Sequence, residues 1–132
     1  MNQNYSLRVA MLVMGLITAA VLPTLSGCSS RSLQGFWTEI ELSEVDLSSV
    51  ADGTYRGQYE GGPVKAVVAV EVAGGRIRNI EILEHRTLLG KKAEREIPSR
   101  VLNAQSVKVD TVTRATASSM VILKAIEKAL TQ

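Results

Sequence analysis

The sequence of 132 residues contains a single cysteine, Cys28, and a single histidine, His85. One cysteine cannot form an internal disulfide. One cysteine and one histidine are also too few for a Cys/His zinc site or a Cys–His catalytic pair. Glu94 and Glu96 do not form a carboxylate pair, because helical residues two positions apart do not face each other. We therefore expect no metal site and no hydrolytic active site.

Aromatic residues are scarce, at 4% of the chain, and the 15 basic residues nearly balance the 13 acidic ones. Base-stacking platforms need aromatic side chains, and a nucleic-acid-binding domain needs a large basic excess. These two shortages exclude nucleic acid as a partner. The small basic excess lies between Asp52 and Gln132, where 13 basic residues outnumber 9 acidic ones. A mildly basic domain suits a phosphate-bearing ligand.

The chain also lacks a hydrophobic run long enough to cross a bilayer. The uncharged stretch 9–22 follows Arg8, and its 14 residues fall short of the ~20 that a transmembrane helix needs. It is typical of a signal-peptide core. Small residues at 26–27 precede Cys28, an arrangement that resembles the bacterial lipobox. We predict a lipoprotein signal peptide at 1–27 and a lipid on Cys28, which anchors the mature chain to the extracytoplasmic face of a membrane.

The segment 28–51 is predicted to be a tether between this anchor and a folded domain at 52–132. Its first residues are small and polar, and apolar and polar residues alternate between Glu39 and Leu47. Such alternation is typical of a short strand or of an extended segment packed on a domain.

From Asp52 onward the apolar residues recur with the period of two that is typical of strands. Turn signals at Gly62-Pro63 and Gly74-Gly75 separate the runs. A change of phase near Asn79 predicts a bulge. Three antiparallel strands are expected, at 54–59, 64–72 and 76–83. Their apolar face needs a helix to cover it.

Two helical patterns follow the strands. Residues 91–105 have a helical pattern that Pro98 is expected to end or restart. Between 118 and 130 apolar residues recur at helical spacing, and the Ser and Thr residues before this run are typical of N-caps. The segment 106–110 between the helices is expected to be a last strand or an extended entry. The predicted fold is a single α+β domain, a small antiparallel sheet covered by helices.

The start of the second helix carries the most informative motif, Asp110-Thr111-Val112-Thr113-Arg114-Ala115-Thr116. Backbone N–H groups and the helix dipole make a helix N-terminus an anion site. Thr116 therefore lies at a position that favours the binding of a phosphate, and the basic Arg114 is close to it in sequence. Most Ser/Thr-rich helix starts are plain caps without a ligand.

This run resembles the flavinylation motif of the FMN-binding domain, which the Rnf and Nqr electron-transport subunits share with many small lipoproteins. In that family an aspartate and two variable residues precede Ser or Thr, then Gly, Ala and a final Thr or Ser. Further landmarks of the family occur in the same order between residues 52 and 132. They are Asp52-Gly53-Thr54-Tyr55 with Gly57, Gly62-Pro63, the valine-rich strand, His85 ahead of Gly90, Gln105-Ser106 and Val109-Asp110.

The resemblance implies that Thr116 carries FMN through a phosphoester. No neighbour in sequence is an obvious base to activate this hydroxyl, so the resemblance implies a separate flavin transferase that uses FAD. The implied protein is a membrane-anchored electron-transfer module that works with membrane redox proteins, rather than a self-contained enzyme. The implied cofactor-binding residues are Asp110, Thr113, Arg114, Ala115 and Thr116 in the motif, with His85 and Gly90 in a loop near the flavin.

Arg114 stands where the family usually has glycine. Its charged side chain either hinders the transferase or places a cation beside the phosphodiester. The alternative function is therefore a lipid-anchored binding or structural protein of the same fold without covalent flavin.

Three further features of the sequence concern the surroundings of the cofactor: the histidine, a pair of leucines and a pair of glutamates. His85 is either a partly exposed loop residue or a contact of the cofactor. Leu88 and Leu89 either cover the flavin ring or belong to the ordinary core. Glu94 and Glu96, which alternate with basic residues, are expected on a solvated helix face.

Overall fold

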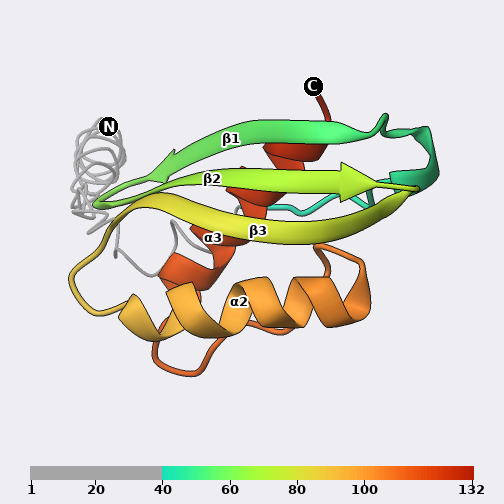
Figure 1. The fold of residues 1–132 in the computed structure, drawn as a ribbon. Coiled ribbons are helices and arrows are strands. Elements are labelled where there is room, and N and C mark those ends of the chain that lie inside the picture. Colours follow the sequence, from blue (N-terminus) through green and yellow to red (C-terminus); the bar gives the residue numbers. More distant parts are fainter. Residues whose placement is uncertain (1–39) are drawn as a thin grey trace, which may run out of the picture. The chain divides into compact units, whose positions relative to one another are not determined.

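The computed structural model describes residues 40–132 (Figure 1). The predicted signal peptide, Cys28 and the first half of the predicted tether lie outside this range. The elements follow in the order η2 (Leu47–Ser49), β1 (Gly53–Gly61), β2 (Val64–Ala73), β3 (Arg76–Arg86), α2 (Lys91–Ala104) and α3 (Thr116–Leu130). This arrangement confirms the predicted α+β fold. No helix within the described range is long and apolar enough to cross a membrane.

The three strands form one antiparallel sheet in the order β1-β2-β3, with β2 in the centre (Figure 1). Gly62 joins the first two strands with a φ of 56°, and Gly74 and Gly75 join the next two with φ values of 61° and 66°. The glycines therefore lie at the turns that the sequence predicted. On β2 the alternate valines Val68 and Val70 are fully buried, as the period of two requires.

Two bulges interrupt the pairing of β2 with β3. One lies at Arg78 and confirms the bulge predicted near Asn79. The other lies at Leu83, and no sequence pattern predicted it. An extra residue reverses the facing of the side chains beyond it. The bulge at Leu83 therefore turns His85 toward the buried face of the sheet, opposite the buried Ala66.

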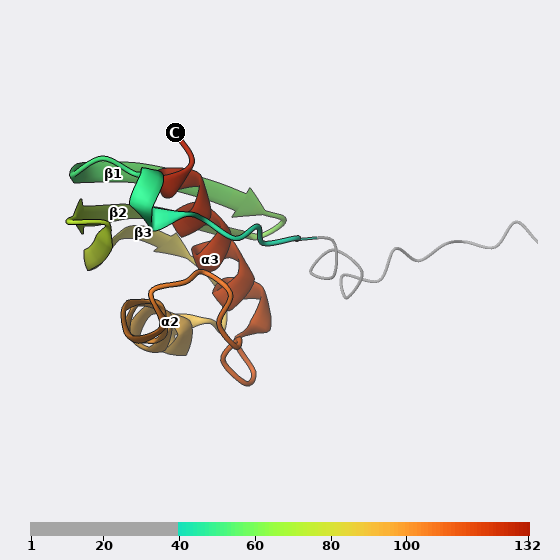
Figure 2. The same cartoon turned by 90° about the vertical axis from the view of Figure 1, so that its right-hand side faces the viewer.

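Both helices cover the same face of the sheet: α3 packs on β1 and β2, and α2 packs on β3 (Figures 1 and 2). The core lies between the sheet and this helical layer. Its fully buried side chains include Val68, Val70, Val72, Ile97, Val101, Val107, Val112, Val121, Ile122, Leu123 and Ile126.

Helix α2 runs without interruption through Pro98, so the prediction that this proline ends or restarts the helix is wrong. Proline lacks an N–H, and inside a helix it costs about 3 kcal/mol. Ala93, Ile97 and Val101 lie one turn apart on α2 and are all buried. Burying each of the two larger side chains contributes about 1.5–3 kcal/mol. Packing on both sides of Pro98 therefore outweighs the cost of the proline.

Helix α2 ends at Gln105, whose φ of 53° is left-handed. The side-chain amide of Gln105 accepts from the N–H of Ile77 (2.8 Å) and donates to its carbonyl (3.0 Å). These bonds fasten the end of α2 to strand β3. The following segment, 106–110, forms no strand. It is an irregular entry to the motif.

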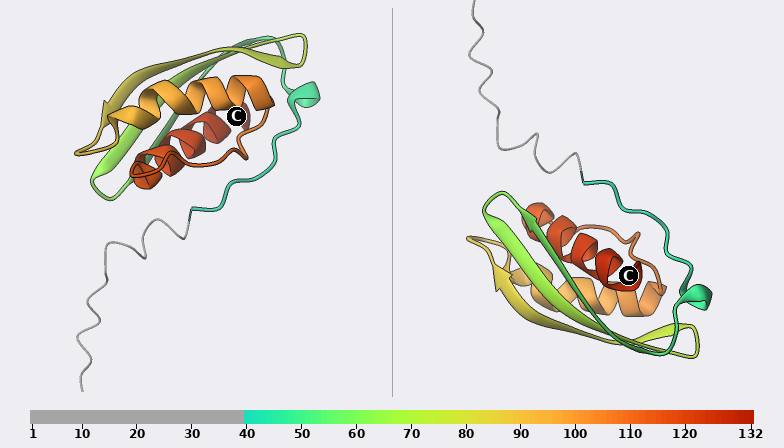
Figure 3. Two further views of the ribbon diagram at one scale, coloured as in Figure 1. Left: turned by 90° about the horizontal axis from the view of Figure 1, so that it is seen from below. Right: turned by 90° about the horizontal axis from the view of Figure 1, so that it is seen from above.

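The segment 40–51 packs along α3 on the helical side of the sheet (Figures 2 and 3). Ile40 belongs to the core, at 7% exposure. Lys124 donates to the carbonyl of Glu41 (2.7 Å), and Glu127 accepts from the N–H of Ser43 (3.2 Å). This part of the predicted tether is thus an extended packed segment, one of the two forms that its alternation predicted.

Candidate functional site

Thr116, the predicted attachment residue, is the first residue of α3 and is exposed. Its hydroxyl makes no hydrogen bond within residues 40–132. The N-cap of α3 is Ala115, which has no side-chain cap. The prediction of a Ser or Thr N-cap is therefore wrong, because Ser118 and Ser119 lie inside the first turn and bond elsewhere. The Thr116 hydroxyl is left available for chemistry.

Hydrogen bonds fix the backbone of the motif against the helix it precedes. The hydroxyl of Ser119 accepts from the N–H of Val112 (3.0 Å) and donates to the carbonyl of Ala115 (2.8 Å). The N–H of Ala115 donates to the carbonyl of Val112 (2.9 Å). Val112 and Ala115 are buried, whereas Thr113 and Arg114 are exposed at the tip. The motif is thus a closed turn that presents its tip and Thr116 to solvent.

Arg114 has a φ of 65°, in the left-handed region. A residue with a Cβ is less stable there by roughly 1–2 kcal/mol, whereas glycine adopts it freely. This conformation explains why the flavinylation motif usually has glycine at the position. The arginine keeps the turn, and it is exposed two residues before Thr116.

Arg100 on α2 holds the entrance of the motif, a role that no sequence pattern indicated. Its guanidinium donates to the carbonyls of Asp110 (2.7 Å) and Thr111 (3.1 Å) and to the carboxylate of Glu96 (2.9 Å). The side chain of Asp110 is exposed. Within the described chain, its predicted role in the site therefore rests on the motif alone.

Replacing Arg100 with alanine is expected to lower the free energy of unfolding by about 1–2 kcal/mol, because two backbone carbonyls lose a charged donor. Urea denaturation followed by circular dichroism measures the change. Arg95→Ala is the matched control, since Arg95 is an exposed cation of the same helix with no ion pair in the described range. Equal losses in both variants would show that Arg100 does not hold the motif.

The loop 86–90 lies against the first turn of α3. The hydroxyls of Thr87 and Ser118 are 2.9 Å apart, and Thr87 also accepts from the N–H of Gly90 (3.0 Å). A Cβ on Gly90 would lie 1.7 Å from the Ser118 hydroxyl, so only glycine fits there. The structure thus brings the predicted loop residues and the predicted motif to one end of the domain.

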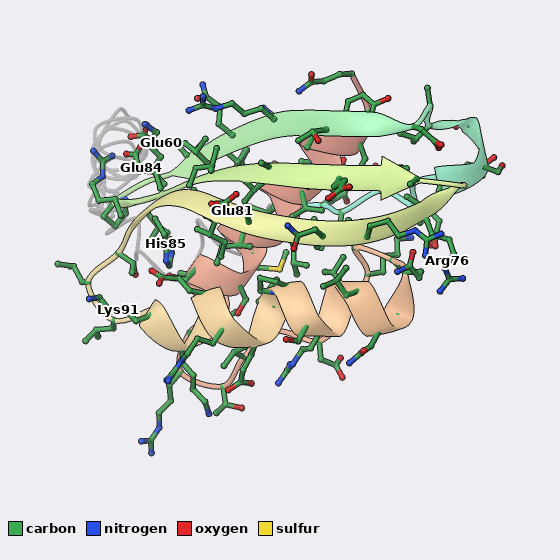
Figure 4. The ribbon with its side chains drawn as sticks, viewed as in Figure 1. Glu60, Arg76, Glu81, Glu84, His85 and Lys91 are labelled. Carbon is green, nitrogen blue, oxygen red and sulfur yellow. The ribbon has the colours of Figure 1, made fainter. Side chains whose placement is uncertain are left out.

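His85 lies between the sheet and α2 (Figure 4), and its side chain is only 1% exposed. Its interpretation as a loop residue is wrong, because His85 lies within β3; the residue as a whole is partly exposed, but its side chain is buried. Nδ1 lies 2.7 Å from the carboxylate of Glu94, while Nε2 is buried without a partner in the described residues. Glu94 therefore does not lie only on a solvated helix face, because its carboxylate contacts His85. The sequence pattern did not indicate this contact.

Leu88 and Leu89 are each 88% exposed, so their interpretation as ordinary core is wrong. They form an apolar pair on the loop that Thr87 ties to Ser118. Two adjacent exposed leucines beside a polar motif provide apolar surface that the folded chain leaves uncovered.

A groove of about 440 Å³ lies at the opposite end of α3. Helix α3 has 15 residues, so about 20 Å separate its two ends. The groove is lined by Glu44, Val45, Asp46, Ser49, Val50, Ala51, Tyr55, Leu130, Thr131 and Gln132. None of the predicted site residues lines it. We place the candidate site at the N-terminal end of α3, where the motif and the 86–90 loop meet.

Comparison with known families decides which family the domain belongs to. A family model described as "FMN-binding domain" matches residues 60–131, more than half of the chain. The chain belongs to the FMN-binding domain family. FMN is accordingly the cofactor of this domain. The matched range runs from the end of β1 to the end of α3 and contains the whole candidate site.

A relative of this FMN-binding domain occurs in Treponema pallidum (strain Nichols), where it is described as an uncharacterized protein. The two are 30% identical over 97 residues, which is 72% of this chain. The aligned region is 27% of the relative, so this chain spans about a quarter of the relative's length.

The residues at this end of the FMN-binding domain fit the cofactor. The exposed Thr116 hydroxyl stands at a helix N-terminus, which favours a phosphate. The unpaired Nε2 of His85 needs a hydrogen-bonding partner. Leu88 and Leu89 offer apolar surface of the kind that lines ligand sites.

Proposed function

We propose that this FMN-binding protein holds its cofactor through a phosphoester to Thr116 and works as an electron-transfer module. The observation that supports this most is the position of Thr116, exposed and unbonded at the first residue of α3. A phosphate there meets the free N–H groups of the first helical turn and the positive end of the helix dipole. When bound, FMN supplies the redox chemistry, and the protein contributes binding and orientation.

Within residues 40–132 no side chain bonds to the Thr116 hydroxyl, so no group of this range is placed to activate it. Attachment therefore needs a separate flavin transferase. In that reaction the Thr116 oxygen attacks the FMN phosphorus of FAD, AMP leaves, and the hydroxyl proton passes to the transferase. The closed turn between Val112 and Ser119 fixes the backbone that precedes Thr116, which suits recognition by a second protein.

We further propose that a lipid on Cys28 anchors the protein at the extracytoplasmic face of a membrane, where it exchanges electrons with membrane redox proteins. The support is the uncharged run 9–22 followed by the lipobox-like residues before Cys28. A covalent cofactor suits this location, because free FMN lost outside the cytoplasm is not replaced.

Coexpression of the full chain with a flavin transferase tests the attachment. The intact mass is expected to rise by one FMN phosphoester, and the band is expected to show flavin fluorescence in a denaturing gel. A mass that stays unshifted, with the transferase active on another substrate, would refute the covalent link.

The second candidate, the same fold without covalent flavin, is favoured by one observation, the arginine at position 114. Arg114→Gly is expected to raise the free energy of unfolding by about 0.5 kcal/mol, because relief of the left-handed strain exceeds the entropy that glycine adds to the unfolded chain. Flavin incorporation, measured by intact mass, is expected to be equal in the two proteins. Incorporation in the glycine variant alone would favour the second candidate.

A further inference from the structure

The loop between β3 and α2 holds an apolar pair in solvent. Leu88 and Leu89 are each 88% exposed, and Leu83, at 45%, is the only other exposed large apolar side chain among residues 40–132. Single exposed apolar residues are common on protein surfaces, whereas adjacent ones form a patch of the kind that marks an interaction site. The pair therefore indicates a surface that binds something.

Hydrogen bonds and close packing hold this loop in place. The hydroxyl of Thr87 lies 2.9 Å from the hydroxyl of Ser118 and accepts from the N–H of Gly90 (3.0 Å). A Cβ on Gly90 would lie 1.7 Å from the Ser118 hydroxyl, so the loop fits tightly against the first turn of α3. The two leucines thus lie between two fixed points of the chain. A binding loop that is already fixed loses less entropy when a partner binds.

The loop lies beside the residue that a flavin transferase must reach. Ser118, which contacts Thr87, lies two residues after Thr116, a rise of about 3 Å along α3. A specific interface covers roughly 800 Å² of each partner, which corresponds to a disc of roughly 16 Å radius. A transferase centred on Thr116 therefore also covers the loop. A membrane docked on the same loop would instead keep the transferase away from Thr116.

Basic residues border the apolar pair. Lys91 and Arg114 are exposed and have no ion pair within the described residues, whereas Arg86 and Lys92 are each paired with a glutamate. Asp110 is the one exposed acidic residue of the motif. The surface is thus apolar in the middle with a basic excess at its border. Its complement is an apolar surface bordered by acidic groups.

We propose that Leu88 and Leu89 are the docking surface by which the flavin transferase holds this protein while it loads Thr116. The transferase meets them with an apolar surface bordered by acidic groups. This inference rests on the proposed attachment at Thr116. The motif supplies the reacting oxygen, and the loop supplies affinity. Binding that is equally strong before and during the reaction lowers KM and leaves kcat unchanged, which distinguishes the loop from the motif.

The test is the rate at which a purified transferase loads the full chain from FAD, measured by flavin fluorescence at varied concentrations of the chain. Leu88→Ser combined with Leu89→Ser is expected to raise the KM for the chain about 10-fold or more and to leave kcat unchanged, because two apolar contacts are lost. Lys91→Glu is expected to raise KM at low salt and less so at high salt. Without flavin, both proteins are expected to melt at the wild-type temperature, because the altered side chains are exposed.

Two matched controls lie outside the loop. Leu83→Ser removes the other exposed leucine, on β3, and is expected to keep the wild-type KM. Arg76→Glu reverses an exposed charge at the far end of the sheet from Lys91 (Figure 4) and is expected to do the same. Equal increases of KM in the controls and in the loop variants would show that the loop has no special role, and the inference would fail.

A protein that cannot be loaded measures docking without chemistry. Thr116→Ala is expected to inhibit the loading of the wild-type chain competitively, because it keeps the docking surface. The same protein with serine at positions 88 and 89 is expected to inhibit about 10-fold more weakly. Equal inhibition by the two proteins would overturn the inference.

The remaining outcomes assign the leucines to another occupant and also overturn the inference. An unchanged KM with shifted flavin absorption bands would mean that the pair contacts only the flavin. An unchanged KM with a dimer that the serines convert to a monomer would mean that the pair binds a second copy of the chain. Slower loading on phosphatidylglycerol vesicles than on phosphatidylcholine vesicles, relieved by the serines, would mean that the pair docks on lipid.

Intact mass separates this inference from the proposed attachment. A wild-type chain that gains no FMN would refute the attachment itself. Full loading of the serine variant at the wild-type KM would refute the docking surface alone.

Discussion

Replacing Gly57 with alanine is expected to lower the free energy of unfolding by about 3 kcal/mol or more. Gly57 lies on β1 where α3 crosses the sheet. A Cβ there would lie 2.0 Å from the carbonyl oxygen of Ala125 and 2.6 Å from the backbone nitrogen of Ala129. Backbone atoms of a helix cannot turn aside as the end of a long side chain can, so α3 as a whole must move away from β1.

This movement affects the largest part of the core. Ile122 and Ile126, on the same helix, are fully buried, and any gap between α3 and β1 leaves them poorly packed. A small domain has about 5–15 kcal/mol of net stability, so the substitution removes a large share of it. Thr116 is the first residue of α3, so a displacement of this helix also disturbs the candidate site.

Urea denaturation followed by circular dichroism measures the effect. Gln58→Ala is the matched control, because Gln58 is the next residue of β1 and is exposed. Its change is expected to stay within about 0.5 kcal/mol. A Gly57→Ala protein that is as stable as this control would mean that α3 does not approach β1 as closely as the structure shows.

The strands were predictable because their signal is local. Alternating valines on β2 and the glycine turns before and after it need no information from distant residues, and both appear where the sequence placed them. The bulge at Arg78 was predictable for the same reason, since it interrupts the spacing of the isoleucines. The bulge at Leu83 was not predictable, because the alternation of apolar and polar residues ends there. The face of the sheet to which the His85 side chain points therefore depends on how β3 pairs with β2.

Pro98 shows where local reasoning fails. The penalty of a proline inside a helix is a property of the residue itself, whereas the burial of Ile97 and Val101 depends on the sheet beneath them. The N-cap of α3 failed in the same way. Ser119 has a side chain typical of a cap, but the fold uses it to bond Val112 across the turn of the motif.

The residues of the candidate site also fall into those that a local sequence signal identifies and those that only the fold brings together. Thr116 and the turn before it lie within seven consecutive residues, so a motif could identify them. Arg100 reaches the motif from α2 through its position in the fold, and Glu94 reaches His85 across the gap between helix and sheet. The one signal for the left-handed turn was the glycine that the family has in place of Arg114, since glycine at a fixed position often marks a positive φ.

Replacing Thr116 with alanine is expected to abolish covalent flavin altogether, because the phosphoester needs the hydroxyl oxygen. The loss is not expected to follow from unfolding: Thr116 is exposed, and alanine is the better helix former by a few tenths of a kcal/mol. The measurement is the intact mass after coexpression with the transferase, beside the melting temperature of the same sample. The expected pair of results is no added mass and a melting temperature equal to that of the wild-type protein without flavin.

Two variants control for the neighbourhood of the hydroxyl. Thr116→Ser keeps an oxygen at the first position of α3 and is expected to retain full loading. Thr111→Ala removes a hydroxyl at a variable position of the motif and is expected to have no effect on loading. Flavin that remains on the Thr116→Ala protein would place the attachment on another residue, and the exposed Thr113, at the tip of the same turn, is the first to examine by peptide mass. Thr116→Ser removes only the methyl group, whereas Thr116→Ala removes the methyl group and the hydroxyl, so a loss confined to Thr116→Ala can be assigned to that single oxygen.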